Sequence, residues 1–150
     1  MLVEFADIVN RLSDEKKTVL TNHEIHQAFK DVYVNVAEPI KTRFYRSSEE
    51  SEGTALSATI EFEGKVSSIE GRGNGPLDAL CNGLRSYLKE DFEICNYTEH
   101  ALERSSNSKA ATYIAIKRGD NMYWGAGVDA NINTASIYAL ISAVNRMLSK

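Results

Sequence analysis

The stretch GRGNGPLDAL, residues 71–80, places three alternating glycines and a proline ahead of a helix-forming run. Gly71, Gly73 and Gly75 permit positive φ angles and leave their main-chain N–H groups uncovered. Pro76 suits the first position of a helix, where its missing N–H group costs nothing. Such a helix N-terminus favours a small anion or a carboxylate. A tight strand-to-helix turn without a ligand explains the same glycines, and spacing alone leaves both interpretations open.

A dinucleotide site is a weaker interpretation of this turn. Its fingerprint requires G-x-G-x-x-G within alternating βαβ units, whereas this sequence has G-x-G-x-G followed by proline. The sequence shows no Ser-His-Asp order, paired catalytic carboxylates or metal-ligand cluster. We therefore expect a binding domain that has no catalytic residues, metal or cofactor of its own.

The composition is that of an acidic globular chain of about one domain. It has 150 residues and a formal net charge of -4, without a basic block, which argues against nucleic-acid binding. No apolar run approaches the roughly 20 residues of a membrane span, and Glu4 and Asp7 interrupt the apolar start that a signal peptide would need. Cys81 and Cys95 lack metal-site spacing, so we expect buried thiols in the cytoplasm or an organelle matrix.

The patterns divide the chain into a helical start and a mixed remainder. Apolar spacing predicts a helix over residues 2–12 and a second helix capped by Thr21 or Asn22. Few apolar residues occur here, so we interpret residues 1–36 as a helical connector. Residues 37–150 would form the domain that it joins.

Period-two alternation and turn residues predict six strands after the connector. The predicted strands occupy residues 40–48, 54–62, 65–71, 92–102, 110–118 and 122–130. Helices are expected over 75–90 and 134–149, the second capped by Asn133. Residues 48–53 would form an acidic turn, and residues 103–109 a loop that could close over a site.

The two predicted helices of the domain repeat a pattern. DALCNGLRSYL at 78–88 matches YALISAVNRML at 138–148 with a constant offset of 60, and each helix follows a Gly-x-Gly strand end. Two copies of strand-strand-strand-helix are the simplest account. We predict an α+β fold in which two βββα units, related by a pseudo-twofold axis, form a two-layer domain with a cleft at their junction.

Three ordered stretches resemble the C-terminal regulatory domain of α-isopropylmalate synthase (2-isopropylmalate synthase). They are GRGNGPLDAL, NYTEHAL…AATYI and WGAGVDANINTASIYALISAVNR, which together span residues 66–147. Residues 1–35 resemble the family's helical connector between its catalytic barrel and this domain. NYTEHAL with WGAGVDANINTAS looks closer to the fungal and actinobacterial subgroup.

The resemblance implies a homodimeric allosteric domain that binds leucine between its halves and inhibits the barrel, an acyltransferase of leucine biosynthesis. The divalent-metal His-x-His and acyl-CoA sites of the barrel are absent, so this chain is not expected to be catalytic alone. Asp78 stands where relatives often have a small residue. Matching the family's motifs residue by residue assigns the leucine site to Gly73, Asn74, Gly75, Pro76, Leu77, Tyr97, His100, Ala101, Ala110, Ala111, Asp129, Asn131, Asn133 and Ala135.

Two alternatives keep the fold and change the function. Citramalate synthase has a related domain that answers to isoleucine, and pockets discriminate such isomers by only about 1–3 kcal/mol. A dimerisation module without any ligand would need the glycine turn for its geometry alone.

Overall fold

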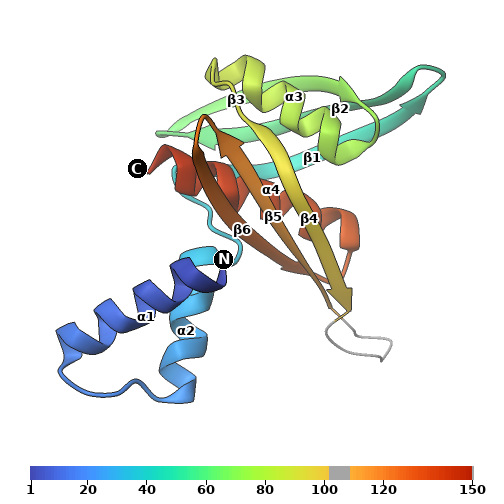
Figure 1. Ribbon diagram of the computed structural model, residues 1–150. Helices are drawn as coiled ribbons and strands as arrows, with labels where there is room; N and C mark the ends of the chain where they lie inside the picture. Colours follow the sequence, from blue (N-terminus) through green and yellow to red (C-terminus); the bar gives the residue numbers. More distant parts are fainter. Residues whose placement is uncertain (102–108, 150) are drawn as a thin grey trace.

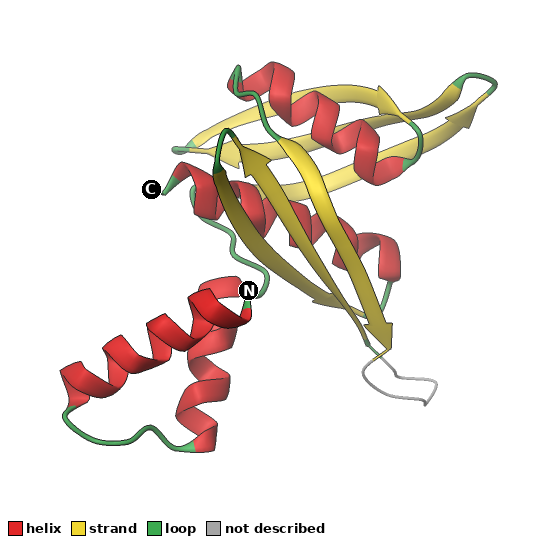
Figure 2. Ribbon diagram, viewed as in Figure 1, coloured by secondary structure: helices red, strands yellow, loops and turns green. Residues whose placement is uncertain are grey.

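The computed structural model describes residues 1–101 and 109–149. Two βββα units follow a helical pair (Figure 2), which confirms the predicted α+β fold class. None of the helices described is long and apolar enough to cross a lipid bilayer. The elements are α1 (Leu2–Lys16), α2 (Asn22–Tyr33), β1 (Ile40–Glu50), β2 (Gly53–Phe62), β3 (Lys65–Gly73), α3 (Pro76–Leu88), β4 (Glu93–Ala101), β5 (Ala110–Arg118), β6 (Asn121–Asp129) and α4 (Ile132–Leu148).

The two sheets are antiparallel meanders with strand orders β1-β2-β3 and β4-β5-β6. Helix α3 packs mainly on β3, and α4 packs on β6 and β5 while also reaching β1 (Figure 1). One apolar cluster joins both sheets and both helices, with Leu84, Ile114 and Leu140 fully buried. The two units therefore close on each other and share one core, as the repeat predicted.

Glycines let each helix approach its sheet at backbone distance. A Cβ atom added to Gly71 would lie 1.9 Å from the carbonyl oxygen of Ala79, and one added to Gly127 would lie 1.9 Å from that of Ala135. Ala79 of the first unit is therefore structurally equivalent to Ala135 of the second. The sequence match aligned Ala79 with Ala139 instead, so its offset of 60 residues is one helical turn longer than the offset in the structure.

Side-chain caps fix where two of the helices begin. Thr21 caps α2, as predicted, through a reciprocal capping box with Glu24. The predicted cap of the last helix was wrong. Asn131 caps α4 instead, because its side-chain oxygen accepts from the main-chain N–H groups of Asn133 and Thr134.

Two regular elements run further than the sequence patterns indicated. Helix α1 continues past residue 12 to Lys16, where Lys17 ends it in a left-handed conformation. Strand β1 pairs with β2 as far as Glu50, so the acidic turn is shorter than the predicted 48–53. The loop predicted over 103–109 falls mostly on residues 102–108, outside the described part of the chain.

The helical pair α1–α2 packs on the side of the second sheet that faces away from α4. Phe5, Phe29 and Tyr33 form an aromatic cluster that contacts Trp124 and Ala126 of β6. Figure 1 shows the pair projecting from this contact, away from both sheets. The predicted boundary between residues 36 and 37 stays a prediction.

The two cysteines differ in exposure, so the prediction that both are buried was wrong for Cys95. Cys81 lies buried in α3, where desolvation raises the pKa of its thiol to about 11. Since the thiolate is the reactive form, we expect a thiol reagent at pH 8 to modify Cys95 and spare Cys81. Mass spectrometry of the labelled chain checks this, with both thiols reacting in denaturant. Rapid native labelling of Cys81 would contradict the packing of α3.

Candidate functional site

A cleft of about 300 Å³ opens at the seam between the two βββα units. This volume lies at the small end of the range for ligand pockets. Its walls come from the turn before α3, the first turn of α3, strand β4 and the first turns of α4. The lining residues are Asn74, Gly75, Pro76, Leu77, Asp78, Tyr97, Asn133, Ser136 and Ile137.

The sequence predicted six of these nine residues and missed three. Ser136 and Ile137 follow Asn133 by three and four positions, so the helical period placed them on the same face. Asp78 lies in the first turn of α3, four positions after Asn74, and the first turn of a helix favours acidic residues. Both signals were present in the sequence.

The glycine turn differs in detail from the expectation that it exposes several free amides. Of the three glycines that permit positive φ, only Gly75 adopts it, with a φ angle of +125°, whereas Gly71 and Gly73 belong to β3 and pair with β2. The missing side chain of Gly73 makes room for Asp78, because an added Cβ atom would overlap its Oδ2. Asp78 Oδ2 accepts from the main-chain N–H of Asn74 at 2.9 Å.

The two helix starts at the seam differ in how their amides are satisfied. Asn131 caps the first amides of α4. At Gly75, the residue that starts α3, no side chain in the described part of the chain makes a capping hydrogen bond. The first turn of α3 therefore keeps unpaired N–H groups beside the cleft, together with the positive end of its dipole.

The second unit contributes a polar wall to the cleft. The Tyr97 hydroxyl donates to Glu99 Oε2 at 2.7 Å and shares a 3.0 Å hydrogen bond with Ser136 Oγ. Burial is the main cause that raises the pKa of Tyr97, and Glu99 raises it further. Tyr97 therefore presents a neutral phenol, and its side chain is 44% exposed.

Strand alternation places two predicted site residues on the other side of the sheet. Tyr97 faces α4, so His100, three residues later, faces away. The His100 ring lies 5.8 Å from the ring of Tyr113, and Ala111 is its cross-strand partner. The structure therefore does not bring His100 and Ala111 together with Tyr97 in this cleft.

Other predicted residues build the entry to α4 or the adjoining strand ends. Asp129 Oδ2 accepts from the main-chain N–H of Asn131 at 2.9 Å, and Ala135 is packed against Gly127. Ala110 pairs with Ala101 on one side and Asp129 on the other. Asp129, Ala135, Ala110 and Gly73 are not among the lining residues of the cleft, and the side chain of Ala101 lies outside the described part of the chain. Contact of these residues with a ligand stays a prediction.

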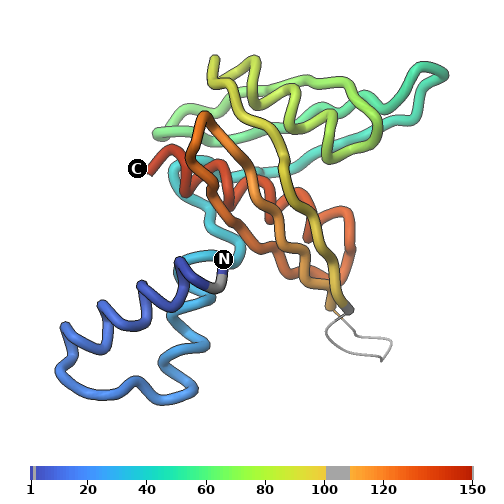
Figure 3. The backbone as a smooth tube through the Cα atoms, in the orientation of Figure 1, coloured from blue at the N-terminus to red at the C-terminus, as the bar shows by residue number. Residues whose placement is uncertain are grey.

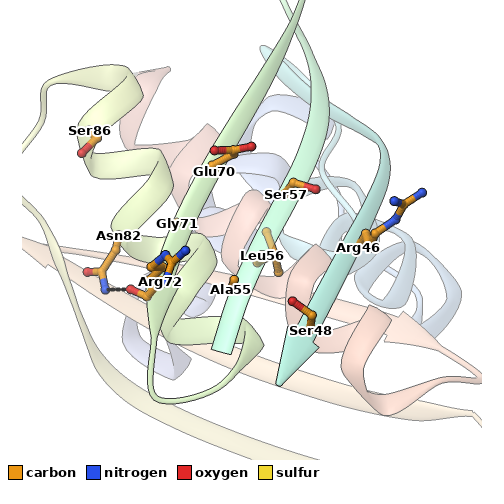
Figure 4. A pocket seen from close by; sticks show the side chains of 10 residues that line it. All are labelled: Arg46, Ser48, Ala55, Leu56, Ser57, Glu70, Gly71, Arg72, Asn82 and Ser86. Atoms are coloured by element: carbon orange, nitrogen blue, oxygen red, sulfur yellow. Dashed lines mark hydrogen bonds between the residues drawn. The ribbon is translucent and has the colours of Figure 1, made fainter. Parts of the chain in front are cut away.

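A second hollow, of about 540 Å³, lies on the outer side of the first sheet (Figure 4). Cross-strand register places Arg46, Ser57 and Glu70 in one row. Arg72 forms an ion pair with Glu50 at 2.8 Å, and its carbonyl oxygen accepts from Asn82. Among the predicted leucine-site residues whose side chains the structure describes, none lines this hollow.

The seam cleft is therefore the candidate site. It lies between the two units and is lined by six predicted residues, and it includes the start of α3, which has no side-chain cap. Within the described residues, no group of His, Cys, Asp and Glu side chains is placed to hold a metal ion. The arrangement combines main-chain donors, one carboxylate and apolar side chains, which suits a small zwitterion.

Comparison with known proteins agrees with this organisation. The 2-isopropylmalate synthase of Clostridium acetobutylicum is 38% identical over 149 residues, which are 95% of this chain and 27% of that protein. Proteins of the same name from Helicobacter hepaticus and Rhizobium johnstonii are 35% and 34% identical, each over 97% of this chain and 27% of the relative. The chain thus spans about a quarter of the length of these curated relatives.

Residues 19–148 match the family described as the LeuA allosteric (dimerisation) domain. The match includes α2, the segment that leads to β1, and both βββα units. It confirms the resemblance to the regulatory domain that the three sequence stretches indicated. Fold, sequence relatives and family match agree that the chain belongs to the LeuA allosteric (dimerisation) domain family.

Proposed function

We propose that this chain is the regulatory part of a 2-isopropylmalate synthase and binds leucine in the seam cleft as a feedback signal. Its partners would be a second copy of the chain and the catalytic barrel, where the divalent metal and acetyl-CoA would act. One observation carries the proposal: the uncapped start of α3 opens into a small cleft whose other wall belongs to the second unit.

Each part of leucine has a matching group in the cleft. The amides in the first turn of α3 suit the carboxylate, because a helix N-terminus favours an anion. The Asp78 carboxylate and the Tyr97 hydroxyl are acceptors for the ammonium group. Leu77 and Ile137 provide apolar surface for the isobutyl side chain.

The inhibitory effect would arise as a population shift. Leucine that contacts both units binds one arrangement of the domain more tightly than another, and so biases the attached barrel. Coupling between two such sites typically amounts to about 1–3 kcal/mol.

Asp78→Asn is expected to weaken leucine binding about 10- to 100-fold. The amide keeps an oxygen for the Asn74 N–H but loses the charge, and a hydrogen bond to a charged group contributes about 1.5–3 kcal/mol. Isothermal calorimetry on the folded variant measures the change. Glu50→Gln is the matched control, because it also replaces a carboxylate with an amide, and Glu50 pairs with Arg72 at the surface and is not an assigned site residue. Equal affinities for both variants and the wild type would remove Asp78 from the site.

A thermal-shift panel tests the effector itself, with L-leucine, D-leucine, L-isoleucine, L-valine and NAD at equal concentration. A ligand at 100 times its Kd stabilises the folded state by about 2.7 kcal/mol, which raises Tm by several degrees in a chain of this size. We expect the largest shift with L-leucine. A larger shift with L-isoleucine supports the isoleucine-sensing alternative, and no shift with any amino acid supports a ligand-free dimerisation module.

A further inference from the structure

Three polar side chains near the C-terminal end of α4 bind the N-terminal segment. They belong to Ser142, Asn145 and Arg146. Arg146 is 9% exposed, and its Nη1 donates to Glu4 Oε1 of α1 and to the carbonyl oxygen of Trp124, each at 2.9 Å. Its guanidinium lies 4.5 Å from the ring centroid of Tyr33 in α2. The Tyr33 hydroxyl donates to the same Glu4 oxygen at 2.7 Å. We call Arg146, Glu4 and Tyr33 the latch.

The segment between α2 and β1 is attached to the same end of α4 (Figure 3). Ser142 Oγ accepts from the main-chain N–H of Val36 at 2.7 Å. Asn145 is fully buried and bonds the N–H and carbonyl groups of Ile40 and the carbonyl of Val36, at 2.7–2.8 Å. Helices α1 and α2, which we call the α1–α2 hairpin, and the segment after them therefore contact the last two turns of α4.

The other end of α4 lines the seam cleft through Asn133, Ser136 and Ile137. The helix has 17 residues, so it is about 25 Å long. Most of its residues from Ala135 to Met147 are buried. Gly125 and Gly127 hold β6 against its backbone, since an added Cβ atom at either position would overlap main-chain atoms of α4. A helix packed this tightly shifts as a unit with its strand.

We propose that α4 transmits cleft occupancy to the α1–α2 hairpin, with the latch as the coupling point. The inference rests on the proposed function, because leucine is the occupant. A ligand on the first turns of α4 restricts the helix, and a restricted helix holds the latch more firmly, so the two contacts reinforce each other. Reciprocity then requires that opening the latch weakens leucine binding by the same factor.

Hydrogen exchange with mass detection on the full chain tests the proposal, with Glu4→Gln as the latch variant. This change keeps an oxygen acceptor for Tyr33 but removes the charge that Arg146 binds. In the wild type, leucine should slow exchange at the cleft and also in residues 2–33, by about fivefold or more. In Glu4→Gln the cleft should still be protected while protection of 2–33 is lost, and leucine affinity by calorimetry should fall by a similar factor.

Glu24→Gln is the matched control, because the polar partners of Glu24 are Lys16 and Thr21, which both belong to the N-terminal helical segment. The Glu24→Gln variant should leave both the leucine affinity and the protection of residues 2–33 unchanged. Protection of the cleft without any change in 2–33 in the wild type would overturn the proposal. The same protection of 2–33 in Glu4→Gln as in the wild type would also overturn it.

A ligand-free comparison separates failure of this proposal from failure of the proposed function. If leucine neither binds nor protects the cleft, the proposed function fails. The coupling through α4 is then judged on the ligand-free proteins. Glu4→Gln should speed exchange in residues 132–137, at the far end of α4, by about fivefold. Unchanged exchange there would contradict transmission through the helix.

Discussion

Asn145→Ala is expected to lower the free energy of unfolding by about 3 kcal/mol or more. The buried amide satisfies three main-chain groups of Val36 and Ile40. Each buried polar group left without a partner costs about 1–3 kcal/mol, and alanine supplies no replacement. Urea unfolding measures the loss as a lower midpoint at an unchanged m-value.

Asn82→Ala in α3 is the control for Asn145→Ala. Asn82 also donates to a main-chain carbonyl, that of Arg72 at 2.7 Å, but this bond lies at the surface. Water can replace the lost partner there, so we expect a cost of about 1 kcal/mol or less. Equal losses for the two variants would show that Asn145 does not anchor the segment between α2 and β1.

Gly127→Ala is expected to cost about 3 kcal/mol or more, because its Cβ atom would lie 1.9 Å from the carbonyl oxygen of Ala135. Relief requires β6 and the buried helix α4 to move apart, and overpacking that shifts side chains and backbone typically costs about 1–3 kcal/mol, occasionally more. Thermal and urea unfolding of the variant measure the loss. Binding at the cleft should weaken too, since Ala135 precedes its lining residue Ser136.

Gly64→Ala separates steric overlap from backbone strain. Gly64 has a φ angle of +82° and nothing within 4 Å of an added Cβ atom, so only its left-handed conformation is penalised, by about 1–2 kcal/mol. A smaller loss for Gly127→Ala than for Gly64→Ala would refute close packing of α4 on β6 as the reason for the glycine.

Local patterns predicted the regular elements well. Period-two alternation in 54–62 corresponds to β2, in which Leu56, Ala58 and Ile60 are buried and alternate with more exposed residues. The repeated helix pattern predicted two βββα units, because each amphipathic helix needs a sheet to cover. The ends of the helices and strands were harder to predict. The start of α4, for example, depends on which asparagine side-chain oxygen accepts from the first main-chain N–H groups of the helix.

The sequence predicted the geometry of the candidate site only in part. The motif match grouped Tyr97 with His100, but residues three apart in a strand face opposite sides of the sheet. That separation was readable once the segment was taken as a strand. The glycine turn was predicted as a place of exposed amides, whereas Asp78 occupies one of them.

Long-range partners could not be read from the sequence. Asn145 and Arg146 are ordinary polar residues in an amphipathic pattern, yet their partners in the N-terminal segment lie more than 100 residues earlier in the chain. No local propensity encodes such a pairing. It depends on how the connector folds back across the second sheet, which is a property of the assembled core.

A crystal structure of the chain with bound L-leucine tests the central claim most directly. Our account predicts density for the amino acid in the seam cleft. Its carboxylate should lie at the first turn of α3, its ammonium group near Asp78 and its side chain against Leu77 and Ile137. Leucine bound at another place, or an empty cleft at a concentration that raises Tm, would contradict the assignment.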